Sequence, residues 1–171
     1  TPDNLLYNYQ SREAENKLRI DRNFSWNDYQ FSAGTNINFA KNTNDSTVKQ
    51  VNQNSVDFDV INSELNLVQY GLYLQTAKKF FENKVQVSLG ARLDASNYSD
   101  LTNNPLEQFS PRFSLNYKFA ENWAFNFNTG IFYQLPAYTS LGLKLNDALV
   151  NENTLKYIRN AHLVGGLEFN G

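Results

Sequence analysis

The chain has 171 residues, enough for one domain, and no cysteine, which excludes disulfide bridges, thiolate metal sites and cysteine nucleophiles. Its net charge of −2, without a basic run, argues against nucleic acid as a partner. No stretch approaches the roughly 20 consecutive apolar residues of a spanning helix, so a membrane role would have to use strands. A content of 13 Phe, 10 Tyr and 2 Trp, with only 4 Pro and 8 Gly, favours strands.

Apolar and polar side chains alternate along seven stretches, as they do on β-strands whose two faces meet different surroundings. The clearest stretch is KVQVSLGARLDA, in which every second side chain from Val85 to Ala95 is apolar. The first stretch is the weakest, because Arg22 interrupts its apolar face. In chain order the predicted strands are residues 16–26, 29–40, 68–76, 84–95, 109–119, 123–134 and 161–170.

Short turns alternate with long polar links between these strands. The turns are Asn27-Asp28, KKFFEN and AEN, and Asn and Asp tolerate the positive φ of a two-residue hairpin. The long links are residues 41–66, 96–108 and 135–160. Antiparallel pairing of consecutive strands would place all short turns at one end of the sheet and all long loops at the other. In the last link, NDALVNENTLKYI predicts a short helix that begins near Asn146 or Asp147.

Strand length and aromatic placement favour lipid rather than a protein core on the apolar side. The predicted strands run 9 to 12 residues, whereas soluble strands average about 5 to 6 and a strand tilted across a bilayer needs about 9 to 11. Aromatic side chains gather at both strand ends, where the girdles of a membrane barrel lie. They are Phe80, Phe81, Phe119 and Trp123 beside the turns, and Phe39, Tyr98, Phe109 and Tyr133 near the long links. The polar side carries mostly Gln, Asn, Ser and Gly, which suits a barrel interior.

The sequence therefore predicts an all-β, antiparallel up-and-down transmembrane β-barrel of the outer membrane, in contact with lipid and lipopolysaccharide. In hydrocarbon every backbone group must be paired, so such a sheet has to close. Seven is an odd number of strands, and the chain stops at residues 169–171 just as a new turn would start. We expect residues 1–171 to be part of one larger β-barrel domain.

Four motifs resemble the barrel of TonB-dependent outer-membrane receptors, in the same order along the chain. They are GARLD, FSPRFSLNY, GIFYQLP and HLVGGLEF. The resemblance implies that the chain is a segment of about seven to eight strands of a 22-stranded barrel. It also implies an N-terminal plug domain and import of a scarce nutrient with energy passed on by the TonB protein. The plug and the TonB-contacting box do not occur in these residues, so we expect them, and the other strands, outside this chain.

Five residues are candidates for ligand contact in the barrel. Arg92 and Arg112 share the inward parity on neighbouring strands, where they could attract an anionic ligand, pair with an acidic plug residue, or form a lumenal network with Asp94; we favour the network. Tyr133, Gln134 and Tyr138 lie at the start of the longest loop, and loops carry recognition on a rigid scaffold. An ordinary aromatic girdle is the alternative reading of the two tyrosines.

Catalytic, cofactor-binding and metal sites are not expected. The single His162 has inward parity and no clustered Asp, Glu or Cys, and the chain contains no nucleophile motif or phosphate loop. We expect no enzymatic activity.

The predicted function is TonB-dependent transport of a nutrient complex, with this chain as barrel wall and extracellular loops. The ligand could be a ferric siderophore, a corrinoid, a glycan or a peptide. One alternative is a complete small outer-membrane barrel with a structural or adhesion role, in which residues 4–15 supply an eighth strand. Another is a soluble β-sandwich binding module, which the strand lengths disfavour.

Overall fold

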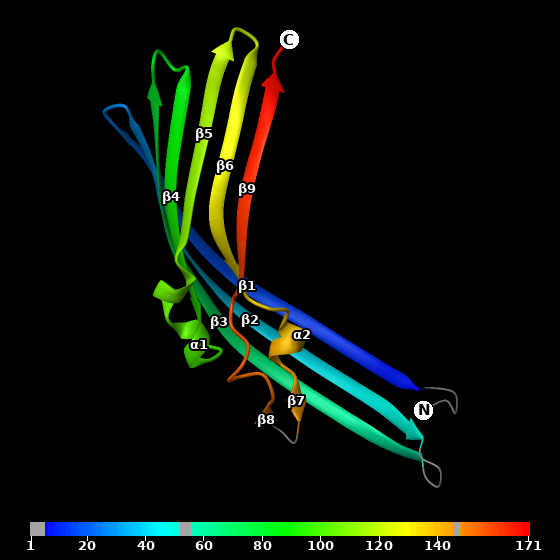
Figure 1. Cartoon of the computed structure of the whole chain (residues 1–171). Coiled ribbons are helices and arrows are strands. Elements are labelled where there is room, and N and C mark those ends of the chain that lie inside the picture. Colours follow the sequence, from blue (N-terminus) through cyan, green and yellow to red (C-terminus); the bar gives the residue numbers. More distant parts are fainter. Residues whose placement is uncertain (1–5, 52–55, 146–147) are drawn as a thin grey trace.

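Seven strands form one curved antiparallel sheet in the computed structural model (Figure 1). The structure describes residues 6–51, 56–145 and 148–171. The strand order in the sheet is β1-β2-β3-β4-β5-β6-β9, so consecutive strands are neighbours throughout. The strands are β1 (Tyr7–Trp26), β2 (Tyr29–Val51), β3 (Val56–Phe80), β4 (Val85–Ser96), β5 (Ser110–Ala120), β6 (Trp123–Gln134) and β9 (Ile158–Phe169). The predicted all-β, up-and-down architecture and all seven predicted strands are confirmed.

The register keeps apolar and polar side chains on opposite faces of the sheet. Leu89 of β4 pairs with Phe113 of β5 on the outer face, and its neighbour Gly90 pairs with Arg112 on the inner face. On the other side of β4, Gly90 pairs with Gln75 of β3. The outer face of the sheet therefore carries the apolar positions of the sequence pattern, and the inner face carries the polar ones.

The short turns lie together at one end of the sheet, at the top of Figure 1, as predicted. Asn27 has the positive φ of 52° expected in the first hairpin. Aromatic rings line the outer face at this end: Trp123 lies 5.0 Å from Phe169, and Phe24 lies 5.1 Å from Phe31, between ring centroids. The predicted aromatic clustering beside the turns is confirmed.

The prediction of a long loop over residues 41–66 is wrong. Strands β1, β2 and β3 have 20, 23 and 25 residues, whereas β4 has 12. Residues 7–16, 40–51 and 56–67 project beyond the other strands as a three-stranded extension, toward the lower right of Figure 1.

The outer face of this extension mixes charged and apolar side chains, so its strands do not keep the alternation of the wall over their full length. Both Lys41 and Glu64 point outward there and form an ion pair, with 2.8 Å between Lys41 Nζ and Glu64 Oε1. In β3 the apolar side chains lie on both faces: Leu65 and Leu67 point inward and are buried, whereas Val56, Phe58 and Val60 point outward and are exposed. The apolar face thus switches sides again between Leu67 and the outward Val68. In β2 both faces of the extension are polar, which leaves no alternation to detect.

The last two links carry short elements, which pack against β4 in the first of these links and against β2 and β3 in the second. The link after β4 contains α1 (Asp100–Asn103) and η1 (Pro105–Gln108), and the link after β6 contains α2 (Tyr138–Leu141) and a hairpin of β7 (Lys144–Leu145) and β8 (Ala148–Leu149). The predicted helix start at Asn146 or Asp147 lies outside the described residues. From Ala148 onward the chain forms β8 and turns, so the predicted helix is wrong.

A small apolar cluster holds these links to the sheet. Leu141 of α2 is fully buried against Ala40, Leu65, Leu67 and Tyr98. The Tyr98 hydroxyl donates a hydrogen bond to the Leu141 carbonyl oxygen at 3.0 Å. The assignment of Tyr98 to an aromatic girdle is therefore wrong, because its ring packs inside the loop cluster.

The structure contains neither an eighth wall strand nor a second stacked sheet among the described residues. One alternative predicted residues 4–15 as a separate strand, but residues 7–15 belong to β1. Strands β1 and β9 form the two edges of the sheet and do not pair with each other in the described parts of the chain. The curved sheet has the form of a half-barrel, which contradicts both the complete small barrel and the β-sandwich.

Candidate functional site on the inner wall

Several cations of the inner face form ion pairs with a carboxylate of the same strand. Arg19 pairs with Asp21 on β1, Arg92 pairs with Asp94 on β4, and the distances between the charged atoms are 2.6 Å in both. Because same-face residues of a strand are two positions apart, each pair forms within one strand and points into the interior.

The network around Arg92 depends on a glycine in the neighbouring strand. Arg92 donates through Nε and Nη2 to both carboxylate oxygens of Asp94, at 2.7 and 2.6 Å, and through Nη2 to Asn36 Oδ1 at 2.8 Å. Opposite Asp94 lies Gly71, where a Cβ would stand 2.6 Å from Asp94 Oδ1 and 2.7 Å from Arg92 Nη2. The predicted network of Arg92 with Asp94 is present.

A similar network on β1 went undetected in the sequence, because Arg22 obscured the strand pattern there. The Tyr73 hydroxyl donates to Asp21 Oδ1 at 2.6 Å, and the Arg19 guanidinium lies 5.6 Å from the centre of the Tyr73 ring. Gly34 makes room for these groups, since a Cβ there would stand 2.6 Å from the Tyr73 ring. The spacing of Arg19 and Asp21 is the signal that could have revealed the network.

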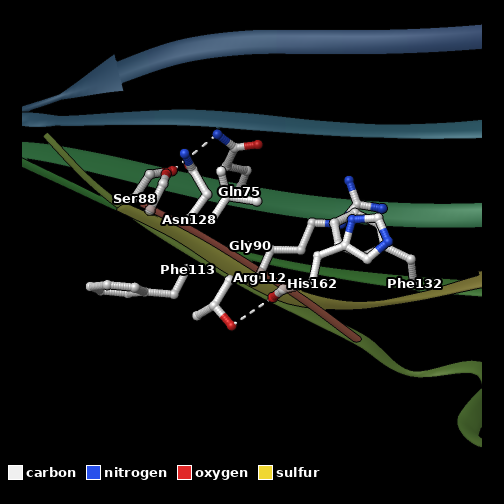
Figure 2. Close-up of a pocket in the computed structure, with 11 residues that line it drawn as sticks. Gln75, Ser88, Gly90, Arg112, Phe113, Asn128, Phe132 and His162 are labelled. Atoms are coloured by element: carbon white, nitrogen blue, oxygen red, sulfur yellow. Dashed lines mark hydrogen bonds between the residues drawn. The ribbon is translucent and has the colours of Figure 1, made fainter. Parts of the chain in front are cut away.

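Arg112 differs from these arginines because no carboxylate of the described residues pairs with it. Its guanidinium lies 4.6 Å from the centre of the Phe132 ring, and that ring lies 4.8 Å from the His162 ring (Figure 2). Gly130 lies between them in the register, pairing with both Arg112 and His162. The missing side chain at Gly130 is what lets the Phe132 ring fold back between the two.

Two hollows flank Arg112 on the inner wall. One, of about 240 Å³, is lined by Gln75, Ser88, Gly90, Phe132 and His162, among others (Figure 2). The other, of about 320 Å³, lies toward Arg19, Tyr73 and Arg92. The first combines polar side chains with the apolar surface of Phe132 and Val164, and the second is lined mostly by polar side chains, so this stretch of wall can receive a polar or anionic group.

The other three predicted site residues lie apart from these hollows. Tyr133 has outward parity at the end of β6 and pairs with Arg159, whereas Gln134 has inward parity and pairs with Ile158. Tyr138 lies on α2, where its hydroxyl donates to Glu15 Oε1 at 2.5 Å and accepts from Gln69 Nε2 at 2.8 Å. Among the described residues the five candidates therefore do not gather in one place: Arg92 and Arg112 line one hollow, and the other three do not line it.

The contact between Tyr138 and Glu15 fixes the last loop onto the extension. Burial, followed by the hydrogen bond to Glu15, raises the pKa of Tyr138 to about 12. The hydrogen bond from Lys17, followed by that from Tyr138, lowers the pKa of Glu15 to about 2. At neutral pH a neutral hydroxyl thus donates to a charged carboxylate, which is a strong form of hydrogen bond.

Comparison with protein families matches residues 1–165 to the family described as TonB dependent receptor-like, beta-barrel. The chain belongs to this TonB-dependent receptor family. No curated protein and no solved structure matched the chain. The resemblance of the four motifs to this family is thereby confirmed.

Membership explains the two faces of the sheet. Barrels of TonB-dependent receptors lie in the outer membrane, surround a plug domain and take part in nutrient transport, so the family is one of transporters rather than enzymes. The apolar outer face is then the lipid face, and the hollows beside Arg112 open toward the barrel interior.

Among the described residues of this receptor barrel, no three His, Cys, Asp or Glu side chains lie close enough together to hold a metal ion. His162 stacks on Phe132, and its carbonyl oxygen accepts a hydrogen bond from Thr129 Oγ1 at 3.0 Å. No helix in the described ranges is long and apolar enough to cross a membrane.

Proposed function

We propose that this chain forms part of the wall and the extracellular loops of a TonB-dependent outer-membrane transporter for a nutrient complex. The observation that supports the proposal most directly is the outer face of the sheet. Leu72, Leu74 and Leu89 leave 55 to 58 % of their surface exposed in a band that no other element covers. In water this surface would oppose folding, whereas hydrocarbon accepts it.

The proposed ligand contacts are on the inner wall and the docked loop. Arg112 and Gln134 face the interior, and Tyr138 holds the loop that covers the inner side of the extension. Arg92 is occupied by Asp94, and Tyr133 faces outward, so their contribution to ligand binding would be indirect. A ferric siderophore, a corrinoid, a glycan or a peptide would each be compatible with a polar wall of this kind.

Cysteine labelling tests the orientation of the wall, because the chain has no cysteine of its own. In the full receptor in outer membranes, Cys at Leu72 or Leu89 should resist a water-soluble maleimide and react with a lipid-soluble one. Cys at Gln75 or Asn128, which have inward parity, should react with the water-soluble reagent once the interior is open to solvent. Equal reactivity on both faces would contradict a lipid-facing sheet.

Transport is tested by measuring which nutrients cells deplete from their growth medium. Cells that carry the receptor and TonB should deplete a nutrient that cells lacking either protein leave behind. On a detergent gel, the native protein should also shift in mobility on boiling, as folded barrels do. A receptor that shifts on boiling but depletes nothing in a TonB-dependent way would support the barrel and contradict the transport function.

We propose no enzymatic role for this chain. Hydrolysis of an ester or a peptide by the receptor, abolished by substitution of His162, would contradict this.

A further inference from the structure

Arg112 lacks the local ion pair that three other cations of the inner wall form. Lys17, Arg19 and Arg92 each form an ion pair with a carboxylate two positions away on the same strand. The corresponding neighbours of Arg112 are Ser110 and Ser114. Its guanidinium forms a ring contact with Phe132 and no ion pair within the described part of the chain. A positive charge on this wall is therefore left without its local counter-charge.

The space beside Arg112 is open on the side of β4. A Cβ at Gly90 would meet no atom of another strand nearer than 3.7 Å, whereas a Cβ at Gly130 would meet the Arg112 and Phe132 side chains at 3.2 Å. Packing thus fills the Gly130 side and leaves the Gly90 side as a hollow of about 240 Å³. The aromatic ring of Phe132 supports the guanidinium at the edge of this hollow (Figure 2).

The groups around the hollow favour an anion. Arg112 supplies the positive charge, because Arg92 on the side of the adjoining hollow is already paired with Asp94. Gln75 and Ser88 are neutral and hydrogen bond to each other at 3.0 Å, and no Asp or Glu lines the hollow of about 240 Å³. A planar carboxylate matches the fork of N–H donors on a guanidinium.

We propose that the hollow over Gly90 binds a carboxylate, with Arg112 as its charge partner. The proposal rests on the proposed function, which places the hollow in the barrel interior. Two sources can supply the carboxylate: a soluble ligand on its way through the barrel, or an acidic side chain from the part of the receptor that occupies the interior. The chemistry of the contact is the same for both.

The test uses the full receptor in detergent with 4-fluorobenzoate as the probe, followed by fluorine NMR. We compare the unmodified receptor with Arg112→Gln, which removes the charge, and with Gly90→Val, which fills the hollow and keeps the charge. Lys118→Gln is the matched control, since it removes a cation from the same face of the same strand but lies outside both hollows. Boiling-dependent gel mobility checks that each variant is folded.

Saturable binding that both Arg112→Gln and Gly90→Val weaken at least tenfold, and that Lys118→Gln leaves unchanged, supports a site for a soluble carboxylate. Absence of binding, with Arg112→Gln lowering the melting temperature several degrees more than Lys118→Gln, supports an acidic side chain of the receptor itself as the occupant. Binding insensitive to Arg112→Gln, or absence of binding with equal melting temperatures, overturns the proposal. TonB-dependent nutrient depletion by the unmodified receptor separates that result from failure of the transport function.

Discussion

Two glycines on the inner wall have opposite roles, although both lie in the middle of a strand. At Gly71 the side chains of Arg92, Asp94 and Asn36 occupy the space that a Cβ would need. At Gly90 that space is empty, and the nearest atoms are at ordinary contact distance. The first glycine is required by an ion-pair network, and the second leaves a hollow.

This difference predicts opposite effects of the same substitution. Gly71→Ala should lower the free energy of unfolding by about 1 to 2 kcal/mol, because the added methyl group displaces the hydrogen-bonded network. Gly90→Ala should raise it by about 0.5 to 1 kcal/mol, because alanine loses less conformational entropy than glycine in a strand. Urea unfolding of the receptor in lipid vesicles measures both. Equal effects of the two substitutions would contradict the assigned roles.

Leu141 is the residue on which loop packing depends most. It is fully buried in the cluster with Leu65, Leu67 and Tyr98. Leu141→Ala should destabilise the docked loop by about 2 to 4 kcal/mol through lost burial and the cavity left behind. Native-state hydrogen exchange of residues 135–157 measures this local free energy. The exposed Leu143 provides the control, and Leu143→Ala should change the exchange little.

At the scale of elements, the three-stranded extension and the loop that covers it form a unit outside the lipid band. Tyr138, from the loop, reaches Glu15 on β1 and Gln69 on β3. Residues far apart in the sequence are thus joined at one point, and the state of this contact depends on pH.

The contact should be fully formed between about pH 5 and pH 10. Glu15 has its pKa lowered from 4.5 to about 2, so its contribution is complete above 4.5 and is lost as the pH falls toward 2. Tyr138 has its pKa raised from 10.0 to about 12, so its contribution is complete below 10 and is lost as the pH rises through 12.

Hydrogen exchange of residues 135–157, corrected for intrinsic pH dependence, should therefore be faster at pH 3 than at pH 6. In Glu15→Gln it should already be several times faster at pH 6 and should respond less to acid. Residues 96–108 provide the internal comparison, because none of their hydrogen bonds reaches Glu15. A loop that responds to acid equally in both proteins would contradict the role of Glu15.

At the scale of the whole molecule, the sheet separates lipid from a polar interior. A charge placed on the lipid face should therefore cost far more than the same charge on the inner face. Leu89→Arg on the outer face should reduce stability by about 2 to 4 kcal/mol. Asn128→Arg, on the inner face, should change stability by less than about 1 kcal/mol. Refolding into lipid vesicles over a urea series measures the difference, and similar losses for the two variants would contradict the assignment of faces.

The wall of the barrel could be predicted from the sequence where its surroundings are simple. From Val85 to Ala95, lipid on one side and a polar interior on the other impose strict alternation, so the strand and its faces are readable. The ion pair of Arg92 with Asp94 was also accessible, because two positions apart on a strand means the same face. Family membership followed from motifs within these strands.

The extension could not be predicted, because its surroundings differ from those of the wall. Between Phe39 and Val68 the outer face carries the ion pair of Lys41 with Glu64 beside exposed apolar side chains, and the inner face contributes Leu65 and Leu67 to the loop cluster around Leu141. In β3 the apolar side chains are outward at Val56, Phe58 and Val60, inward at Leu65 and Leu67, and outward again from Val68, so local pattern and true strand disagree. Only the packing of a distant loop determines which side is buried.

The sequence by itself determined the strands that cross the membrane, their apolar face, the side of the short turns and the receptor family. The tertiary structure decided the length of β1, β2 and β3, the inward burial of Tyr98, the contact between Tyr138 and Glu15, and the lack of an ion pair at Arg112 among the described residues. The physical reason is the range of the interactions involved. Alternation arises because each residue of a wall strand faces either lipid or the polar interior, and this can be read residue by residue. Whether a face is covered by a loop, or a cation lacks a counter-charge, depends instead on which strands and loops become neighbours.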